Sequence, residues 1–276
     1  MENAVQEVDK WDASAIKRDT PCGDGRLAWR IWGSGSPVVL IHGNGGSWTH
    51  WIRNLEALSR KHTLYVPDLP GNGDSSEPVM PPTMLGFAEL LWQGLDILLP
   101  DRDKVDVLGF SLGSVIGECM ALQRPGQVRN LVLLRGSFSS TFAKLPDNVI
   151  RWRGIQDPVE MAQAQRHNLS VLMFHDPARI DDLAIHTHTQ NLLRSTLDIR
   201  PLLASRPANV FESLTGNIHG ISGEFDVYGG DDIAAQGQRL LKTHPQAGFH
   251  LVKGAGHWAI YEAAEQVNAI LDKAIA

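Results

Sequence analysis

Residues 105–114 read VDVLGFSLGS, and the fold can be inferred outward from this stretch. A β-branched apolar run leads into Gly-x-Ser-x-Gly, and residues 111–125 (SLGSVIGECMALQRP) continue with helical character. Glycines at 109 and 113 leave room for a tight turn between strand and helix. At its centre, Ser111 is expected to adopt a disfavoured backbone conformation and to raise its hydroxyl above the sheet edge. The alternative is that Ser111 only caps the helix, since serine is a favoured N-cap residue.

Short apolar runs alternate with helix-length segments on both sides of this turn. That alternation favours a mostly parallel, doubly wound α/β sheet with helices on both faces. Strands are expected at 26–33, 37–43, 62–71, 104–111, 128–136, 217–226 and 247–257. Helices are expected at 231–244 and 259–275. The fold class is therefore predicted to be α/β.

The alternation stops between about residues 137 and 216. Five prolines there separate helix-like pieces, of which the clearest are 158–174 and 179–195. The simplest account is a core domain formed by residues 1–136 and 217–276, interrupted by a helical cap insertion at 137–216.

Composition limits the classes of function. The 276 residues, 43% of them hydrophobic, suit one α/β domain with an insertion. A net charge of −6 without a lysine and arginine cluster gives no surface for nucleic acid. No segment has the length and apolar character of a signal peptide or of a membrane span, so a cytoplasmic protein without a membrane partner is expected. Cys22 and Cys119 form neither a disulfide framework nor a metal pair, and a homodimer is left open.

A serine nucleophile needs a base within hydrogen-bond reach and an acid that orients the base. Asp226 follows the predicted strand at 217–226, and His257 follows the last predicted strand. Both lie where loops at the carboxyl edge of a parallel sheet converge. Ser111, Asp226 and His257 are therefore predicted to form a catalytic triad. Asp231 or Asp232 is the alternative acid, although both fit better as the cap of the following helix.

Other histidines and one aspartate have structural interpretations. His42 is expected to be structural in its loop, and His167, His175, His186 and His188 are interpreted as cap or surface residues. A metal site is not predicted, because no cysteine or carboxylate cluster at ligand spacing joins them. Asp68 precedes the turn-forming run LPGNGDS and is expected to hydrogen-bond that loop together.

The order Ser, Asp, His along the chain, with LIHGNGGSW at 40–48 and PDLPGNGDS at 67–75, resembles the α/β-hydrolase superfamily over about residues 27–270. The resemblance implies an oxyanion hole made by the backbone N–H groups of Asn44 and Leu112. Fixed N–H groups of this kind stabilise the negative charge that develops on an attacked carbonyl oxygen. Serine at the nucleophile position argues against dehalogenase-like and epoxide-hydrolase-like chemistry. By the same resemblance, enzymes of those kinds carry aspartate at this position.

The triad implies attack on a carbonyl and hydrolysis of an acyl-enzyme, with no metal or organic cofactor needed for any step. The favoured substrate is a small or medium hydrophobic ester or lactone. The alternative is a carbon–carbon bond hydrolase of the meta-cleavage-product type, which residues 256–271 (GHWAIYEAAEQVNAIL) resemble. GFSLGS and HGNGGSW depart from the motifs of those enzymes. A ligand-binding receptor on the same fold also stays open.

Aromatic and apolar residues near the predicted site are candidates for a substrate pocket. They are Trp48, Phe138, Met173, Phe174 and Trp258. A cap arginine that would hold a substrate carboxylate cannot be fixed among Arg151, Arg153, Arg166 and Arg194.

Overall fold

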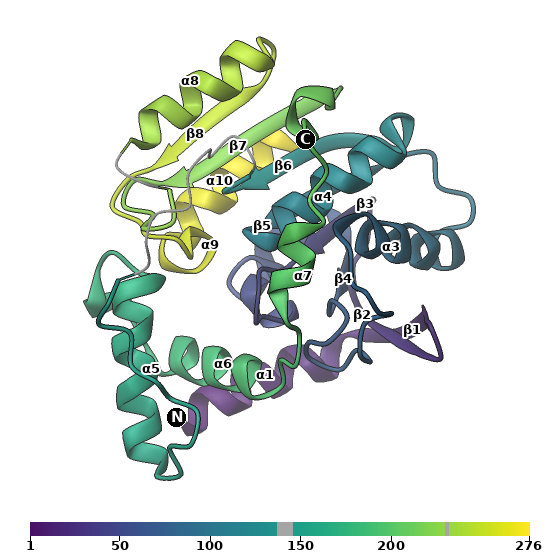
Figure 1. Ribbon diagram of the computed structural model, residues 1–276. Helices are drawn as coiled ribbons and strands as arrows, with labels where there is room; N and C mark the ends of the chain where they lie inside the picture. The colour runs from purple at the N-terminus through teal and green to yellow at the C-terminus, as the bar shows by residue number, and fades with distance from the viewer. Residues whose placement is uncertain (137–145, 230–231) are drawn as a thin grey trace.

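The computed structural model describes residues 1–136, 146–229 and 232–276. Within these ranges, eight strands form one sheet in the order β1-β2-β4-β3-β5-β6-β7-β8 (Figure 1). Strand β2 runs antiparallel to both of its neighbours, and the pairs from β4 through β3 to β8 are all parallel. The strands are β1 Ile16–Cys22, β2 Gly25–Gly33, β3 Ser36–Ile41, β4 His62–Pro67, β5 Val105–Phe110, β6 Val128–Leu134, β7 Asn217–Gly223 and β8 Gly248–Val252.

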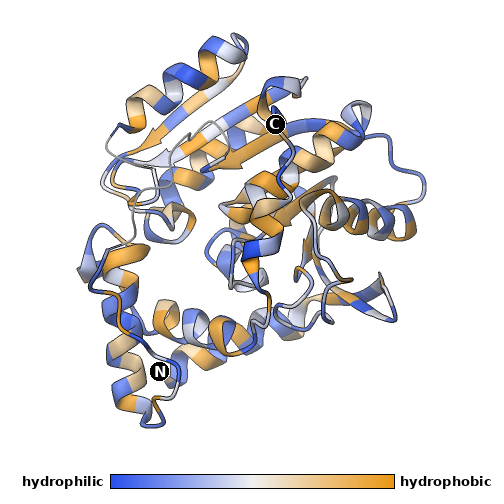
Figure 2. Ribbon diagram, in the orientation of Figure 1, coloured by the Kyte–Doolittle hydropathy of each residue, from blue (hydrophilic) through white to orange (hydrophobic). Residues whose placement is uncertain are grey.

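The central strands are apolar because both of their faces are buried. All six residues of β5 are buried, and side chains alternate between two apolar clusters on opposite faces of the sheet. Leu108 packs into one cluster, and its neighbour Val107 packs into the other. Figure 2 shows apolar residues along these strands, between the helices.

Helices cover both clusters. Helices α3 (Met84–Leu98), α4 (Leu112–Gln123) and α8 (Ile233–Thr243) contribute to one, and α2 (Leu55–Ser59), α9 (Ala259–Glu262) and α10 (Ala264–Ala274) to the other. Each predicted strand overlaps an observed one, so the predicted α/β fold class is confirmed. None of the helices in the described ranges combines the length and the apolar composition needed to cross a bilayer.

Residues 146–216 form helices and turns. The elements are α5 Pro158–Leu172, η3 Pro177–Arg179, α6 Asp182–Leu193, α7 Ile199–Ala204 and η4 Phe211–Ser213. Hydrogen bonds join this segment to loops that follow β4 and β8, with the Thr196 N–H donating to the Gly71 carbonyl (2.9 Å) and the Trp258 N–H donating to the Met173 carbonyl (2.8 Å). The segment is therefore attached at the carboxyl edge of the sheet.

The chain before residue 26, for which the sequence predicted no element, forms helix α1 (Glu2–Ser14) and strand β1. Helix α1 packs alongside α6, and β1 lies at the sheet edge (Figure 1). Both escape a search for apolar periodicity, because α1 buries only Ala4 fully and β1 exposes most of its residues. The helix expected at 259–275 is observed as two helices, α9 and α10, which are separated at Ala263.

Candidate active site

The turn between β5 and α4 holds Ser111 in a strained conformation. Ser111 has φ 53° and ψ −114°, a region that residues with a side chain rarely adopt. A Cβ at Gly109 would lie 2.3 Å from the Gly113 carbonyl oxygen, and a Cβ at Gly113 would lie 2.3 Å from the Ile41 carbonyl oxygen. Both positions therefore require glycine, because the elbow packs directly on backbone.

The Ser111 side chain does not cap the helix. Ser111 occupies the N-cap position of α4, but within the described chain its hydroxyl accepts no capping hydrogen bond. The Oγ atom instead lies 3.1 Å from Nε2 of His257. The capping interpretation therefore does not account for this side chain, whereas an interaction between a nucleophile and a base does.

His257 and Asp226 form the next hydrogen bond. His257 follows β8, and its Nδ1 lies 3.0 and 2.9 Å from the two carboxylate oxygens of Asp226, which follows β7. Burial by itself would raise the pKa of Asp226, but the adjacent His257, aided by Arg135 and the Tyr228 N–H, outweighs it and lowers that pKa. The carboxylate is therefore ionised and can hold the imidazole in one orientation. The structure thus brings the three predicted triad residues together.

Asn44 and Leu112, the predicted oxyanion donors, both line the cavity that contains Ser111. Leu112 is the first residue of α4, where a backbone N–H has no acceptor within its own helix. The loop that carries Asn44 is held at Gly43, whose carbonyl accepts from Nδ1 of His42 (2.7 Å). The other ring nitrogen of His42 accepts the Leu69 N–H (2.8 Å), which fixes the tautomer and makes His42 structural in its loop, as predicted.

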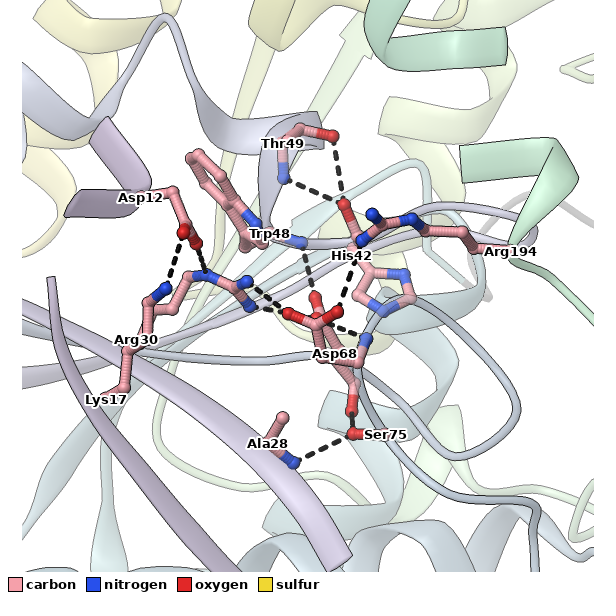
Figure 3. A network of polar contacts seen from close by, with 12 residues as sticks. Asp12, Lys17, Ala28, Arg30, His42, Trp48, Thr49, Asp68, Ser75 and Arg194 are labelled. Carbon is pink, nitrogen blue, oxygen red and sulfur yellow. Dashed lines mark hydrogen bonds and ion pairs between the residues drawn. The ribbon is translucent and has the colours of Figure 1, made fainter. Parts of the chain in front are cut away.

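Asp68 binds its own loop and the loop that follows β3 (Figure 3). Its carboxylate accepts the Trp48 N–H (2.9 Å) and the Asp74 N–H (3.0 Å), and it pairs with Arg30 (3.0 Å). Arg30 also pairs with Asp74 and with Asp12 of helix α1. The predicted role of Asp68 in hydrogen-bonding its own loop together is confirmed, and the same network extends to the loop after β3 and to α1.

A cavity of about 410 Å³ opens above Ser111. Its polar lining comes from Asn44, Ser111 and His257 and from three further side chains, which are His50, Arg135 and Tyr228. The apolar side chains of the lining are Phe110, Leu112, Val115, Met173, Ile199 and Leu203. A cavity of this size, apolar on much of its surface, suits a small or medium ligand.

The aromatic and apolar residues predicted for the pocket lie mostly elsewhere. Met173 lines the cavity, and Phe138 lies outside the described residues. Trp48 is corrected to a core position, where its ring packs on Trp32 (5.4 Å between centroids). Phe174 and Trp258 are also corrected to the core, where they pack on each other (5.9 Å). Large apolar side chains occur both in cores and in pockets, so residue type alone does not separate the two.

Sequence reasoning missed three polar residues of the cavity. Arg135 directly follows β6, so the rule that located Asp226 and His257 at strand ends would also have found it. Tyr228 lies two residues after Asp226, and burial, together with the Asp226 charge, raises the pKa of its phenol to about 12. His50 lies in the short 3-10 helix η1 (Trp48–Trp51), which no periodic pattern marks.

The remaining predicted alternatives have structural positions. Asp232 caps α8 by accepting the Ala235 N–H (2.8 Å), whereas Asp231 lies outside the described residues. His175 stacks on Phe225 at 3.6 Å between ring centroids. In the parts of the chain that the structure describes, no group of three His, Cys, Asp or Glu side chains is arranged to hold a metal ion.

Comparison with known proteins identifies the fold of the chain. The family model described as alpha/beta hydrolase fold matches residues 36–164, which include β3 to β6 and the Ser111 elbow. The chain has the α/β-hydrolase fold. This α/β-hydrolase is 28% identical to a 2-hydroxy-6-oxononadienedioate/2-hydroxy-6-oxononatrienedioate hydrolase of Cupriavidus pinatubonensis, over 98% of each chain.

Other curated relatives are matched over part of their length. The α/β-hydrolase is 27% identical to the dihydrolipoyllysine-residue acetyltransferase component of an acetoin cleaving system of Pseudomonas putida, over 85% of this chain and 62% of that protein. It is 34% identical to the pimeloyl-[acyl-carrier protein] methyl ester esterase of Vibrio campbellii, over 48% of this chain and 47% of that protein. The chain thus spans less than two thirds of the length of these two relatives.

Solved structures share the fold across nearly the whole chain. Carboxylesterase CesB of Bacillus subtilis superposes with a TM-score of 0.78 at 18% identity, covering 100% of this chain and 99% of that one. The meta-cleavage product hydrolase CumD of Pseudomonas fluorescens superposes with a TM-score of 0.75 at 18% identity, covering 94% and 97%. At this level of identity the likeness defines the fold, and esterases and carbon–carbon bond hydrolases share it.

Proposed function

We propose that this α/β-hydrolase is a serine hydrolase that cleaves a small or medium hydrophobic carboxylic ester or lactone through an acyl-enzyme. One observation carries the proposal: hydrogen bonds run from Asp226 through His257 to Ser111, whose hydroxyl opens on a partly apolar cavity. A serine hydroxyl at a strained elbow with a base at 3.1 Å is arranged for nucleophilic attack.

In the proposed reaction, Ser111 Oγ attacks the carbonyl carbon of the ester and His257 Nε2 accepts the serine proton. The Asp226 carboxylate stabilises the imidazolium, and the N–H groups of Asn44 and Leu112 bind the oxyanion. The tetrahedral intermediate collapses as His257 donates its proton to the leaving oxygen. Water, deprotonated by His257, then attacks the acyl-enzyme, which releases the acid and restores Ser111.

The lining of the cavity supports an apolar acyl or leaving group. Val115 on helix α4 provides one wall, and Met173, Ile199 and Leu203 from segment 146–216 contribute to another. We therefore also propose that residues 137–216 form a cap over the site, with the core made by 1–136 and 217–276. The oxyanion donors and His257 belong to that core, so the cap would select substrates without supplying the reacting groups.

A second candidate is hydrolysis of a carbon–carbon bond next to a carbonyl in an anionic substrate. Two observations favour it: the guanidinium-bearing Arg135 lines the cavity, and a relative matched over 98% of its length carries the name of such a hydrolase. An arginine suits recognition of a substrate carboxylate. The arginine in the described cavity lining is Arg135 of the core, whereas the four cap arginines considered from the sequence do not take part in that lining.

The two candidates are tested by one assay. Hydrolysis of p-nitrophenyl butyrate and of a ring-fission dienoate is measured with wild type, with Ser111→Ala and with Ser34→Ala, an exposed serine used as control. Faster turnover of the ester, lost only in Ser111→Ala, supports the ester hydrolase, and the same pattern with the dienoate supports the second candidate.

A serine-reactive phosphonate provides an independent readout. Mass spectrometry should locate the adduct on Ser111 in wild type and find none in Ser111→Ala. A folded wild type that turns over neither substrate and takes up no phosphonate would instead be a ligand-binding member of the fold.

A further inference from the structure

His50 is a buried histidine in the wall of the catalytic cavity, outside the triad. It lies in η1, is 2% exposed, and lines the cavity together with Ser111. The Gly43 N–H donates to its Nδ1 at 3.3 Å. Because Nδ1 accepts this hydrogen bond, a neutral His50 ring carries its proton on Nε2.

The surroundings of His50 keep the ring neutral. Burial lowers the pKa of His50 well below its ordinary value, and the neighbouring histidines His42, His188 and His257 lower it further. A neutral imidazole with a fixed tautomer is a hydrogen-bond donor at Nε2, and at neutral pH it is a poor proton acceptor there.

The Nε2 atom has no hydrogen-bond partner among the described residues. It is not completely buried, so it is accessible to a ligand. The ring is packed between Phe110 (5.4 Å between centroids) and Trp258 (5.2 Å). Gly46 lies against the ring edge at Cε1, and the ring also lines the cavity that contains Ser111. We propose that His50 is a specificity-determining residue, whose Nε2–H donates to a substrate oxygen next to the scissile carbonyl.

The position of His50 relative to Ser111 limits where that oxygen lies. His50 is hydrogen-bonded to Gly43, and a Cβ at Gly43 would lie 3.2 Å from the Ser111 Cβ. Gly43 also directly precedes Asn44, the proposed oxyanion donor. A donor in this place reaches atoms close to the carbon under attack, and it does not reach the far end of an acyl chain. This inference rests on the proposed function and narrows its substrate class to acyl groups with an oxygen on the carbon next to the carbonyl.

One competing acceptor lies nearby. Nδ1 of His188, on helix α6, is fully buried and has no hydrogen-bond partner among the described residues. His188 also interacts electrostatically with His50. If Nε2–H of His50 pointed to His188, it would play no part in choosing the substrate.

Two esters of equal length separate these cases. p-Nitrophenyl methoxyacetate has the same chain length as p-nitrophenyl butyrate. It differs in one position, where an oxygen bonded to the α-carbon replaces a methylene group. The ratio of their kcat/KM values is measured in wild type, in His50→Asn and in His50→Gln. Asparagine retains an acceptor for the Gly43 N–H but lacks a donor at the Nε2 position, whereas glutamine retains a donor there.

The proposal predicts that His50→Asn lowers the methoxyacetate-to-butyrate ratio by about fivefold, and that His50→Gln keeps the ratio within about twofold of wild type. Equal losses on both esters in His50→Asn, with the ratio unchanged, would overturn the proposal and leave His50 as a support of the oxyanion loop. An unchanged ratio with wild-type rates on both esters in every variant would also overturn it, in favour of the contact with His188.

Failure of the proposed function gives a different result. In that case wild type hydrolyses neither ester, and Ser111→Ala matches wild type. Wild-type turnover that is lost in Ser111→Ala, together with a ratio that His50→Asn leaves unchanged, would reject only the role of His50. Thermal unfolding of each variant checks that the ratio is measured on folded protein.

Discussion

The Glu262 carboxylate accepts a hydrogen bond of 2.6 Å from the backbone N–H of Gly256, the residue directly before His257. The same carboxylate accepts the N–H groups of His175 (3.0 Å) and Asp176 (2.7 Å), which follow helix α5. One buried side chain therefore fixes the loop that carries the imidazole. It also joins that loop to the segment that contributes Met173 to the cavity.

Replacing this carboxylate should affect both stability and activity. In Glu262→Gln the side-chain volume is kept, but one accepting oxygen becomes an NH₂ group that faces backbone donors. We expect the free energy of unfolding to fall by about 2 kcal/mol. We also expect kcat for p-nitrophenyl butyrate to fall about tenfold, because the imidazole is less well positioned. Urea unfolding and steady-state kinetics measure the two effects.

Glu265→Gln is the matched control, since Glu265 is exposed on the neighbouring helix α10. Its free energy of unfolding should stay within about 0.5 kcal/mol of wild type. Equal behaviour of the two variants would show that Glu262 does not position the His257 loop.

The choice of Asp226 as the acid can be tested against Asp232. Asp226→Asn should lower kcat by about 10³- to 10⁴-fold, because an amide no longer selects the His257 tautomer that accepts the serine proton. Asp232→Asn should keep kcat near wild type, because Asp232 only caps α8 through the Ala235 N–H. The kcat values for p-nitrophenyl butyrate decide the matter. A larger loss in Asp232→Asn would reassign the acid.

The catalytic candidates could be predicted from the sequence because each of them follows a strand. Ser111, Asp226 and His257 come after β5, β7 and β8, and parallel strands deliver the residues that follow them to one edge of the sheet. The positions of the apolar runs therefore implied a meeting of side chains more than a hundred residues apart. The same logic applies to Arg135, which follows β6, but a triad has no position for an arginine, so the sequence does not single it out.

The walls of the cavity could not be predicted in this way. Trp48 and Trp258 also lie in loops that follow strands, yet both pack into the core. Whether a tryptophan faces core or cavity depends on how neighbouring loops close over it, and its hydrophobicity is the same in either place. His50 shows the converse case. It lies between two core tryptophans in a short 3-10 turn, and its orientation follows from its hydrogen bond to Gly43 and from its packing on Phe110 and Trp258.

The elbow glycines should be irreplaceable for a steric reason. Gly109→Ala would place a methyl group 2.3 Å from the Gly113 carbonyl oxygen, a backbone atom that cannot move aside without disturbing α4. We expect the free energy of unfolding to fall by about 3 kcal/mol, at the upper end of the usual cost of overpacking. Gly126→Ala is the control, because its added Cβ would meet nothing within 4 Å. Chemical denaturation of both variants measures the difference, and similar stabilities would contradict the close packing of the elbow.

The buried histidines should make the fold less stable as the pH falls below about 6.5. Burial lowers the pKa of His188 to about 4, whereas an unfolded chain protonates the same ring near its ordinary value of 6.5. Between these two values the unfolded state binds more protons than the folded state, so the free energy of unfolding must decrease as the pH decreases. His188 should contribute a slope of up to about 1.4 kcal/mol per pH unit. Urea unfolding of wild type and His188→Gln at intervals from pH 4.5 to 7 measures this slope. The variant should show a shallower dependence, and parallel curves would mean that His188 takes up its proton equally in both states.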